Sequence, residues 1–278
     1  MRLATVRVDG GTRAVRVDAD HHVDLGLADV GALLAGRDWS ERAESVGADA
    51  VRYTAADVEW APLVPSPGKI VCVGLNYRTH ILEMGRELPE HPTLFAKFAD
   101  ALVGAGDDIA LPPESDAMDW EAELTIVIGR EVRRGDAAQA AAAIAGFTVM
   151  NDVTMRDWQF RTREWLQGKT FEGTTPLGPM LVTPDELPGG VRPSLSLTCT
   201  VDGETVQKAD TSDLVFDPVT LVQYVSTIGT LRPGDVIATG TPGGVGHART
   251  PPRYLSVGNV VVASIDGIGQ LRNRVCAG

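Results

Sequence analysis

The sequence predicts an α+β fold in which strands predominate, with a small N-terminal α/β domain ahead of a larger, strand-rich domain. Many short segments alternate apolar and polar residues and are rich in valine and isoleucine, which is typical of strands with a buried face. Helical patterns are fewer and short. A stretch at 58–68 contains three prolines and indicates a semi-rigid linker, so we place the domains at 1–64 and 65–278.

The N-terminal portion opens with a predicted hairpin. Residues 2–8 and 13–17 alternate in the manner of strands, and Asp9, Gly10 and Gly11 stand between them as a turn. Short helices are expected at 29–36 and 39–46.

The larger domain alternates strands with a few helices. Asp136 and Asp217 precede two of the helical patterns and are expected to cap them. A hairpin is expected around Asp202-Gly203. The predicted strands are 69–74, 91–98, 124–129, 146–151, 195–201, 204–206, 236–239, 259–265 and 268–275, and the predicted helices are 77–84, 137–145 and 217–228.

The composition narrows the classes of partner. The 278 residues carry a formal net charge of −12 and the pI is near 4.8, which argues against nucleic acids and anionic membrane surfaces. No apolar run approaches the roughly 18 residues that cross a bilayer, and the N-terminus lacks a signal pattern. The three cysteines have no metal-type spacing, which fits a reducing compartment. We therefore expect a cytoplasmic protein.

Two carboxylates stand two residues apart where a predicted strand begins. Glu121 and Glu123 share one face of that strand, while Ala122 and Leu124 face the other way into a core. Adjacent like charges repel, and a hard divalent cation such as Mg²⁺ or Mn²⁺ relieves that repulsion. The alternative is a solvated acidic pair on an outer face.

Two further groups have both a chemical and an ordinary interpretation. His80 and Glu83 lie three apart on one face of a predicted helix, where the carboxylate could orient the histidine as a general base, or the two could form a surface pair. Asp152 follows a predicted strand and is either a third metal ligand or a helix cap.

Several motifs, in this order along the chain, resemble the fumarylacetoacetate hydrolase family over roughly residues 65–275. The motifs are Gly74-Leu-Asn-Tyr-Arg-Thr-His80, Asp119-Trp-Glu-Ala-Glu-Leu124, Asn151-Asp-Val-Thr-Met-Arg-Asp-Trp-Gln159, Gln167-Gly-Lys-Thr-Phe171, Thr239-Gly-Thr-Pro-Gly-Gly-Val-Gly246 and the tail from Pro251 to Asn273. The resemblance implies a mixed β-sandwich roll and a homodimer. Trp120 and Thr154 depart from the more usual tyrosine and serine without touching an expected ligand.

The resemblance also implies a site. It makes Glu121, Glu123 and Asp152 the ligands of one Mg²⁺ or Mn²⁺ per chain, and it makes His80, Glu83 and Lys169 catalytic. The residues expected to bind substrate are Arg78, Lys97, Gln159, Gly240 and Thr241.

The implied reaction is hydrolysis of the C–C bond of an acylpyruvate-type 2,4-dioxo acid, with fumarylpyruvate cleaved to fumarate and pyruvate as the leading example in aromatic-compound catabolism. The partner would be a small anionic 2-oxo acid. The alternatives within the family are an oxaloacetate-type decarboxylase and a 2-hydroxyhepta-2,4-diene-1,7-dioate isomerase/decarboxylase. An alternative of another class is a non-catalytic metal-binding β-protein, which would have no use for the histidine–glutamate pair or for Lys169.

Overall fold

Two β-sheets face one another in the computed structural model, which describes residues 1–19, 21–47 and 49–278. The larger sheet has twelve strands, ten of them in the spatial order β4-β3-β2-β1-β14-β12-β11-β17-β6-β7, with β5 paired to β1 and β8 paired to β14. Its strands are β1 (Arg2–Val8), β2 (Gly11–Val17), β3 (His22–Asp24), β4 (Arg52–Tyr53), β5 (Glu59–Trp60), β6 (Ile70–Gly74), β7 (Thr93–Lys97), β8 (Leu102–Val103), β11 (Ala122–Ile128), β12 (Ile144–Asn151), β14 (Thr175–Val182) and β17 (Val236–Ala238).

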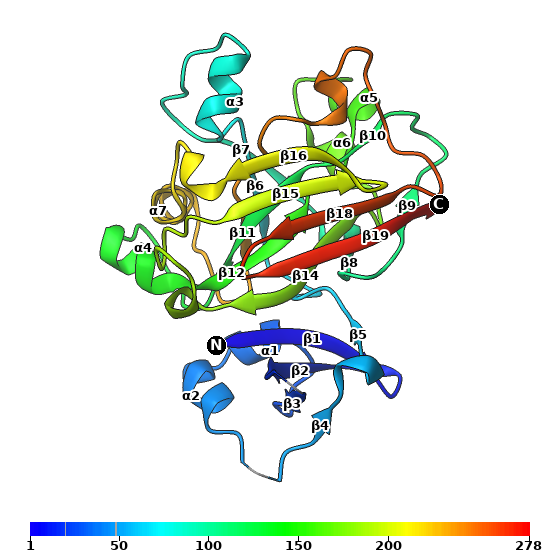
Figure 1. Cartoon of the computed structure of the whole chain (residues 1–278). Coiled ribbons are helices and arrows are strands. Elements are labelled where there is room, and N and C mark those ends of the chain that lie inside the picture. The colour runs from blue at the N-terminus through cyan, green and yellow to red at the C-terminus, as the bar shows by residue number, and fades with distance from the viewer. Residues whose placement is uncertain (20, 48) are drawn as a thin grey trace.

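The second sheet has the order β16-β15-β18-β19-β9 and lies across part of the first (Figure 1). Its members are β9 (Ile109–Leu111), β15 (Ser196–Val201), β16 (Glu204–Asp210), β18 (Val260–Ile265) and β19 (Gly269–Ala277), while β10 (Met118–Asp119) and β13 (Thr154–Met155) form a separate two-stranded ladder. The strand-dominated α+β fold expected from the sequence is confirmed.

The helices are short and lie around the sheets (Figure 1). The two predicted caps are present: Asp136 Oδ1 accepts the backbone N–H of Gln139 at 2.8 Å, and Asp217 Oδ1 accepts that of Thr220 at 2.9 Å. The helices are α1 (Val30–Leu34), α2 (Trp39–Glu44), α3 (Arg78–Glu83), α4 (Ala137–Ala143), α5 (Arg156–Gln159), α6 (Leu166–Lys169) and α7 (Pro218–Ile228), with 3-10 turns η1 (Ala55–Asp57), η2 (Ala99–Ala101), η3 (Pro184–Glu186), η4 (Thr211–Asp213) and η5 (Gly246–Ala248).

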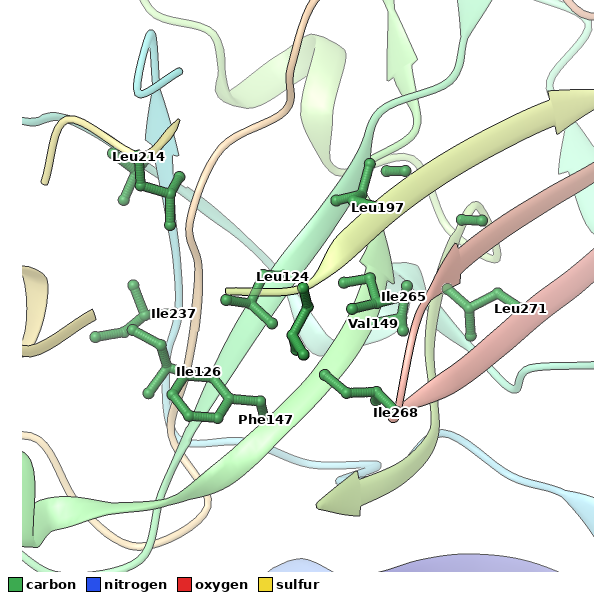
Figure 2. Packing of buried hydrophobic residues seen from close by; sticks show 14 of the residues in the cluster. Leu124, Ile126, Phe147, Val149, Leu197, Leu214, Ile237, Ile265, Ile268 and Leu271 are labelled. Carbon is green, nitrogen blue, oxygen red and sulfur yellow. The ribbon is translucent and has the colours of Figure 1, made fainter. Parts of the chain in front are cut away.

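The main core lies between the two sheets. Figure 2 shows side chains of β11 and β12, among them Leu124, Phe147 and Val149, packed toward Leu197 and Ile265 of the second sheet. The other face of β11 is buried as well, because Val127 belongs to a second apolar cluster that includes side chains of the N-terminal region. A strand buried on both faces holds its ends rigidly, and β11 is the strand that begins beside the acidic pair.

The predicted N-terminal hairpin is confirmed, with Leu3 opposite Arg16 and a turn in which Asp9 and Gly10 have φ of 47° and 76°. This hairpin is continuous with the large sheet, because β1 pairs antiparallel with β14. The segment 58–68 is packed rather than free, since it contributes β5 to the sheet and buries Leu63 completely. The boundary between residues 64 and 65 stays a prediction.

Within the described ranges, no helix has both the length and the apolar character that crossing a membrane requires.

Candidate metal centre and active site

Three buried carboxylates meet where β11 begins and β12 ends. The two strands are antiparallel neighbours with Ala122 opposite Asn151, so Glu121 and Asp152, the residues just beyond this pair, also lie side by side. The Asp152 N–H donates to the Glu121 carbonyl at 2.8 Å and fixes that arrangement. One carboxylate oxygen each from Glu121, Glu123 and Asp152 lies within 4.8 Å of the others.

Three cations surround this cluster. Lys169 Nζ is 2.7 Å from Glu121 Oε2 and 2.8 Å from Asp152 Oδ2. Lys97 Nζ is 2.7 Å from Asp152 Oδ1, and Arg156 Nη2 is 2.6 Å from Glu121 Oε1. All five side chains are less than a tenth exposed, so these charges interact with little screening by water.

The cations do not neutralise the third carboxylate. Glu123 forms no ion pair within the described part of the chain and accepts only the Gly240 N–H, at 2.8 Å. Burial, then the charges of Asp152 and Glu121, raise the pKa of Glu123 well above its usual range. By contrast, Lys169 and Arg156 outweigh the effect of burial at Glu121 and lower its pKa. Glu123 is thus the carboxylate that lacks a positive partner.

The donor set fits a hard divalent cation. Each carboxylate oxygen has two lone pairs, so Glu121 and Asp152 can keep their contacts with the cations and still offer an oxygen to a metal ion. All three candidate ligands are oxygen donors, which Mg²⁺ and Mn²⁺ prefer. These three residues could therefore bind a metal ion, as the sequence indicated.

A cavity of about 300 Å³ opens next to the cluster. Glu121, Glu123 and Lys169 form its inner end, and His80, Gln159 and Thr241 contribute to the walls. Thr241 Oγ1 donates to the Ala122 carbonyl at 3.0 Å, which fastens the glycine-rich loop to β11. The structure therefore brings seven predicted residues, Glu121, Glu123, Asp152, His80, Lys169, Gln159 and Thr241, to one cavity and the acidic cluster behind it.

Gly240 does not line the cavity but supports it. Its φ is 101°, which favours glycine, and a Cβ there would lie 2.9 Å from the Val73 carbonyl oxygen. The glycine permits the close approach that lets its N–H reach Glu123.

His80 faces the cavity from α3, whereas Glu83 does not contribute to the wall. Among the described residues no hydrogen bond joins the two side chains, although both pass close to Gly243: a Cβ there would lie 3.0 Å from His80 Nδ1 and 3.7 Å from Glu83 Oε2. Burial lowers the pKa of His80, and the charge of Glu83 partly opposes this. His80 is consequently a neutral base near pH 7.

The structure places neither Arg78 nor Lys97 in the cavity wall. Arg78 is exposed at the start of α3. Lys97 is buried behind the cluster, where its ammonium donates to Asp152 and, at 3.1 Å, to the Val153 carbonyl. In this geometry Lys97 contacts a candidate metal ligand, and its role in binding substrate stays a prediction.

Sequence reasoning missed the residues that organise the site. Asp119 is fully buried and accepts four donors: the N–H groups of Trp120, Gly246 and His247, and Arg156 Nε at 2.8 Å. Arg156 in turn contacts Glu121 and donates to Gln159 Oε1 at 2.9 Å. Asp119 and Arg156 both belong to the family motifs, but no local pattern indicates that their side chains pair across 37 positions.

The chain belongs to the fumarylacetoacetate hydrolase family, because the model of the family's C-terminal domain, "Fumarylacetoacetate (FAA) hydrolase C-terminal", matches residues 69–276. This confirms the family expected from the sequence.

The relatives of this chain are named for different reactions. Oxaloacetate tautomerase Fahd2a, mitochondrial, of Rattus norvegicus is 41% identical over 265 residues, covering 91% of this chain and 83% of the relative. Fumarylacetoacetate hydrolase of the psychrophilic Exiguobacterium antarcticum has 33% identity and a TM-score of 0.87, with both chains fully covered. 5-Carboxymethyl-2-hydroxymuconate delta-isomerase of Mycobacterium smegmatis has 31% identity and a TM-score of 0.82, again over both whole chains. Membership of the family therefore does not by itself distinguish tautomerisation, hydrolysis and isomerisation.

Proposed function

We propose that this protein is a divalent-metal-dependent enzyme that interconverts the keto and enol forms of oxaloacetate. The observation that carries the proposal is one cavity that joins a three-carboxylate cluster to a neutral histidine and a buried lysine, His80 and Lys169. The extended similarity to a rat oxaloacetate tautomerase supports the choice of substrate. A keto–enol exchange needs a base and a means to stabilise an enolate, and it needs no activated water.

A cation held by Glu121, Glu123 and Asp152, Mg²⁺ or Mn²⁺ as we propose, would supply Lewis acidity for the 2-oxo-acid end of the substrate. Lys169 keeps its proton, because Asp152 and Glu121 outweigh the effect of burial and raise its pKa. Its ammonium therefore stabilises negative charge that develops on the carbonyl oxygen without giving up a proton. Gln159, held by Arg156 through its Oε1, has its amide N–H groups left to donate to the substrate.

His80 moves the proton in this scheme. The neutral imidazole takes a proton from C3, the electron pair of that C–H bond forms the C2–C3 double bond, and the carbonyl oxygen becomes an enolate oxygen. The imidazolium then returns the proton to that oxygen, which completes the enol. No water is consumed and no C–C bond breaks. Because burial keeps His80 neutral, the base is ready at neutral pH.

The second candidate is hydrolysis of an acylpyruvate, the reaction expected first from the sequence. It is favoured by the approach of Glu83 toward His80, since a carboxylate that orients a histidine suits a base acting on water. Water would give its proton to His80 and attack the distal acyl carbonyl, and the C–C bond would break toward a pyruvate enolate. The similarity to the hydrolase of Exiguobacterium antarcticum supports this alternative. Decarboxylation of oxaloacetate would also pass through a pyruvate enolate, with loss of CO₂.

One assay panel separates these reactions. Enol oxaloacetate is followed by its ultraviolet absorbance, and pyruvate is measured after incubation with oxaloacetate, fumarylpyruvate or acetylpyruvate, with Mg²⁺, Mn²⁺ or EDTA. We expect metal-dependent loss of the enol signal without pyruvate, and a loss of that activity of at least about 100-fold in His80→Gln. His91→Gln, which changes an exposed histidine outside the cavity, should retain full activity.

Other outcomes of the panel assign the function differently. Fumarate with pyruvate from fumarylpyruvate would establish the hydrolase, and CO₂ with pyruvate from oxaloacetate the decarboxylase. Metal binding without turnover of any substrate would support the non-catalytic alternative. Homodimerisation and a cytoplasmic location stay proposals; the first is tested by sedimentation, and the second by fractionation, which matters because the rat relative is described as mitochondrial.

A further inference from the structure

The cavity has an outer end that the proposed chemistry does not use. Glu121, Glu123 and Lys169 are buried at the inner end of the cavity, whereas Arg86, Phe160 and His247 are exposed and line its outer end. Arg86 follows α3, Phe160 follows α5, and His247 lies in η5. A substrate whose 2-oxo-acid end lies at the cluster would extend its other end among these side chains.

His247 is held in place by several contacts. Its Nδ1 is 2.9 Å from the Tyr254 hydroxyl, its ring stacks on Tyr254 with centroids 6.3 Å apart, and its other neighbour is Phe160 at 5.2 Å. Its backbone N–H donates to Asp119 Oδ2 at 2.9 Å. The ring is consequently fixed in position, although the residue is exposed.

The contact with Tyr254 engages only one of the two ring nitrogens of His247. Burial, then the charge of Arg156, lower the pKa of His247, so the ring is neutral near pH 7. A neutral imidazole has one N–H, and when Nδ1 accepts the Tyr254 hydroxyl proton, that N–H is on Nε2. Nε2 makes no hydrogen bond within the described part of the chain, and in that tautomer it can donate to a ligand.

Arg86 supplies a second hydrogen-bond donor, and its positive charge is complementary to a carboxylate. It forms no ion pair with any acidic residue that the structure describes, in contrast to Arg156 and Lys169. Its charge is near enough to His80 to oppose protonation of that ring. Guanidinium groups bind carboxylates through paired hydrogen bonds, so an unpaired one at a cavity mouth favours an anionic group.

We propose that the outer end of the cavity is a subsite for a second carboxylate of the substrate, bound by the Nε2 proton of His247 and the guanidinium of Arg86. This assignment rests on the proposed function and selects dicarboxylic 2-oxo acids over monocarboxylic ones. Tyr254 acts through His247 and is a positioning residue.

The test compares two acids that differ at one end. 2-Oxobutanoate is oxaloacetate with a methyl group in place of the distal carboxylate. Equilibrium dialysis with Mg²⁺ measures the binding of each acid as the total of keto and enol forms, so it does not depend on turnover. We expect the wild-type protein to bind oxaloacetate at least about tenfold more tightly. Arg86→Gln and His247→Val should each weaken oxaloacetate about tenfold and leave 2-oxobutanoate within about twofold.

Two further variants complete the design. Tyr254→Phe should weaken the binding of oxaloacetate by a smaller factor, because the imidazole of His247 then loses the hydroxyl group that favours one tautomer. Arg163→Gln, a change at an exposed arginine outside the cavity, should alter neither acid. Unchanged binding of 2-oxobutanoate also shows that each variant is folded.

Equal affinities of the wild-type protein for the two acids, or a parallel loss of both in the variants, would overturn the subsite. Selective binding in a protein without tautomerase activity would support the subsite and reject the proposed function. Tautomerase activity without selectivity would do the reverse.

Discussion

Glu123→Gln should separate metal binding from folding. Metal that binds only the folded chain stabilises it by about 2.7 kcal/mol at 100 times the dissociation constant. At about 2–4 °C per kcal/mol for a chain of this size, the wild-type Tm should rise by about 5–10 °C. Glu123 is the one carboxylate of the cluster without an ion pair among the described residues, so a metal ion would be its main positive partner. If the variant binds the metal about 100-fold more weakly, the same concentration stabilises it by only about 0.4 kcal/mol.

The measurement is a thermal melt with EDTA and with increasing Mn²⁺ or Mg²⁺. In EDTA the variant should melt at or above the wild-type temperature, because a neutral amide replaces a buried carboxyl group whose ionisation burial and the charges of Asp152 and Glu121 oppose. Asp235→Asn is the matched control. Asp235 is equally buried, is not part of the carboxylate cluster and pairs with Lys69 at 2.8 Å, so the substitution should lower Tm and leave the metal-induced rise intact. A variant that kept a rise of several degrees would refute the assignment of Glu123 as a ligand.

Three other substitutions test the fold around the site. Phe147→Ala should cost about 3–5 kcal/mol in urea unfolding, because the ring is fully buried between the sheets; a loss below about 1 kcal/mol would contradict that packing. Gly240→Ala should weaken metal binding more than it lowers Tm, since its Cβ would press on the Val73 carbonyl and displace the N–H that Glu123 accepts, and titration calorimetry would show the difference. Burial lowers the pKa of His22, so the unfolded chain takes up a proton first as pH falls below about 6.5. The stability that His22 contributes above that pH is then lost as the pH falls toward the pKa of the folded state. His22→Phe should therefore reduce the fall in the urea midpoint between pH 7.5 and pH 5. Equal falls in both proteins would show that His22 does not contribute.

Local signals accounted for much of the fold. The N-terminal hairpin follows from alternation around Asp9 and Gly10, and the helix at Pro218–Ile228 follows from the Asp217 cap and the proline after it. Such features depend on residues a few positions apart, which sequence patterns record directly. The spacing of Glu121 and Glu123 belongs to the same class, because alternation within one strand puts both carboxylates on one side.

Long-range features were not accessible in this way. The pairing of Arg2 with Val182 joins two strands separated by most of the chain, and no local pattern sets that register. For the same reason no local pattern indicates that Lys97 lies behind Asp152. A buried lysine in an apolar strand and an aspartate after another strand are each ambiguous until the fold brings them to 2.7 Å.

The candidate metal ligands and the proposed base belong to parts of the molecule that differ in how freely their residues can be replaced. Glu121 and Asp152 are fixed by neighbouring strands whose residues are buried on all sides, so a substitution there disturbs the whole sheet. His80, Arg86 and His247 lie on short segments near the surface. If they act as proposed, a different side chain there would alter the reaction or the substrate and leave the carboxylate cluster in place. One fold can thus acquire a new reaction when residues at the outer end of its cavity are exchanged. The tautomerase, hydrolase and isomerase among the relatives of this chain are consistent with that separation between a constant cluster and variable surroundings.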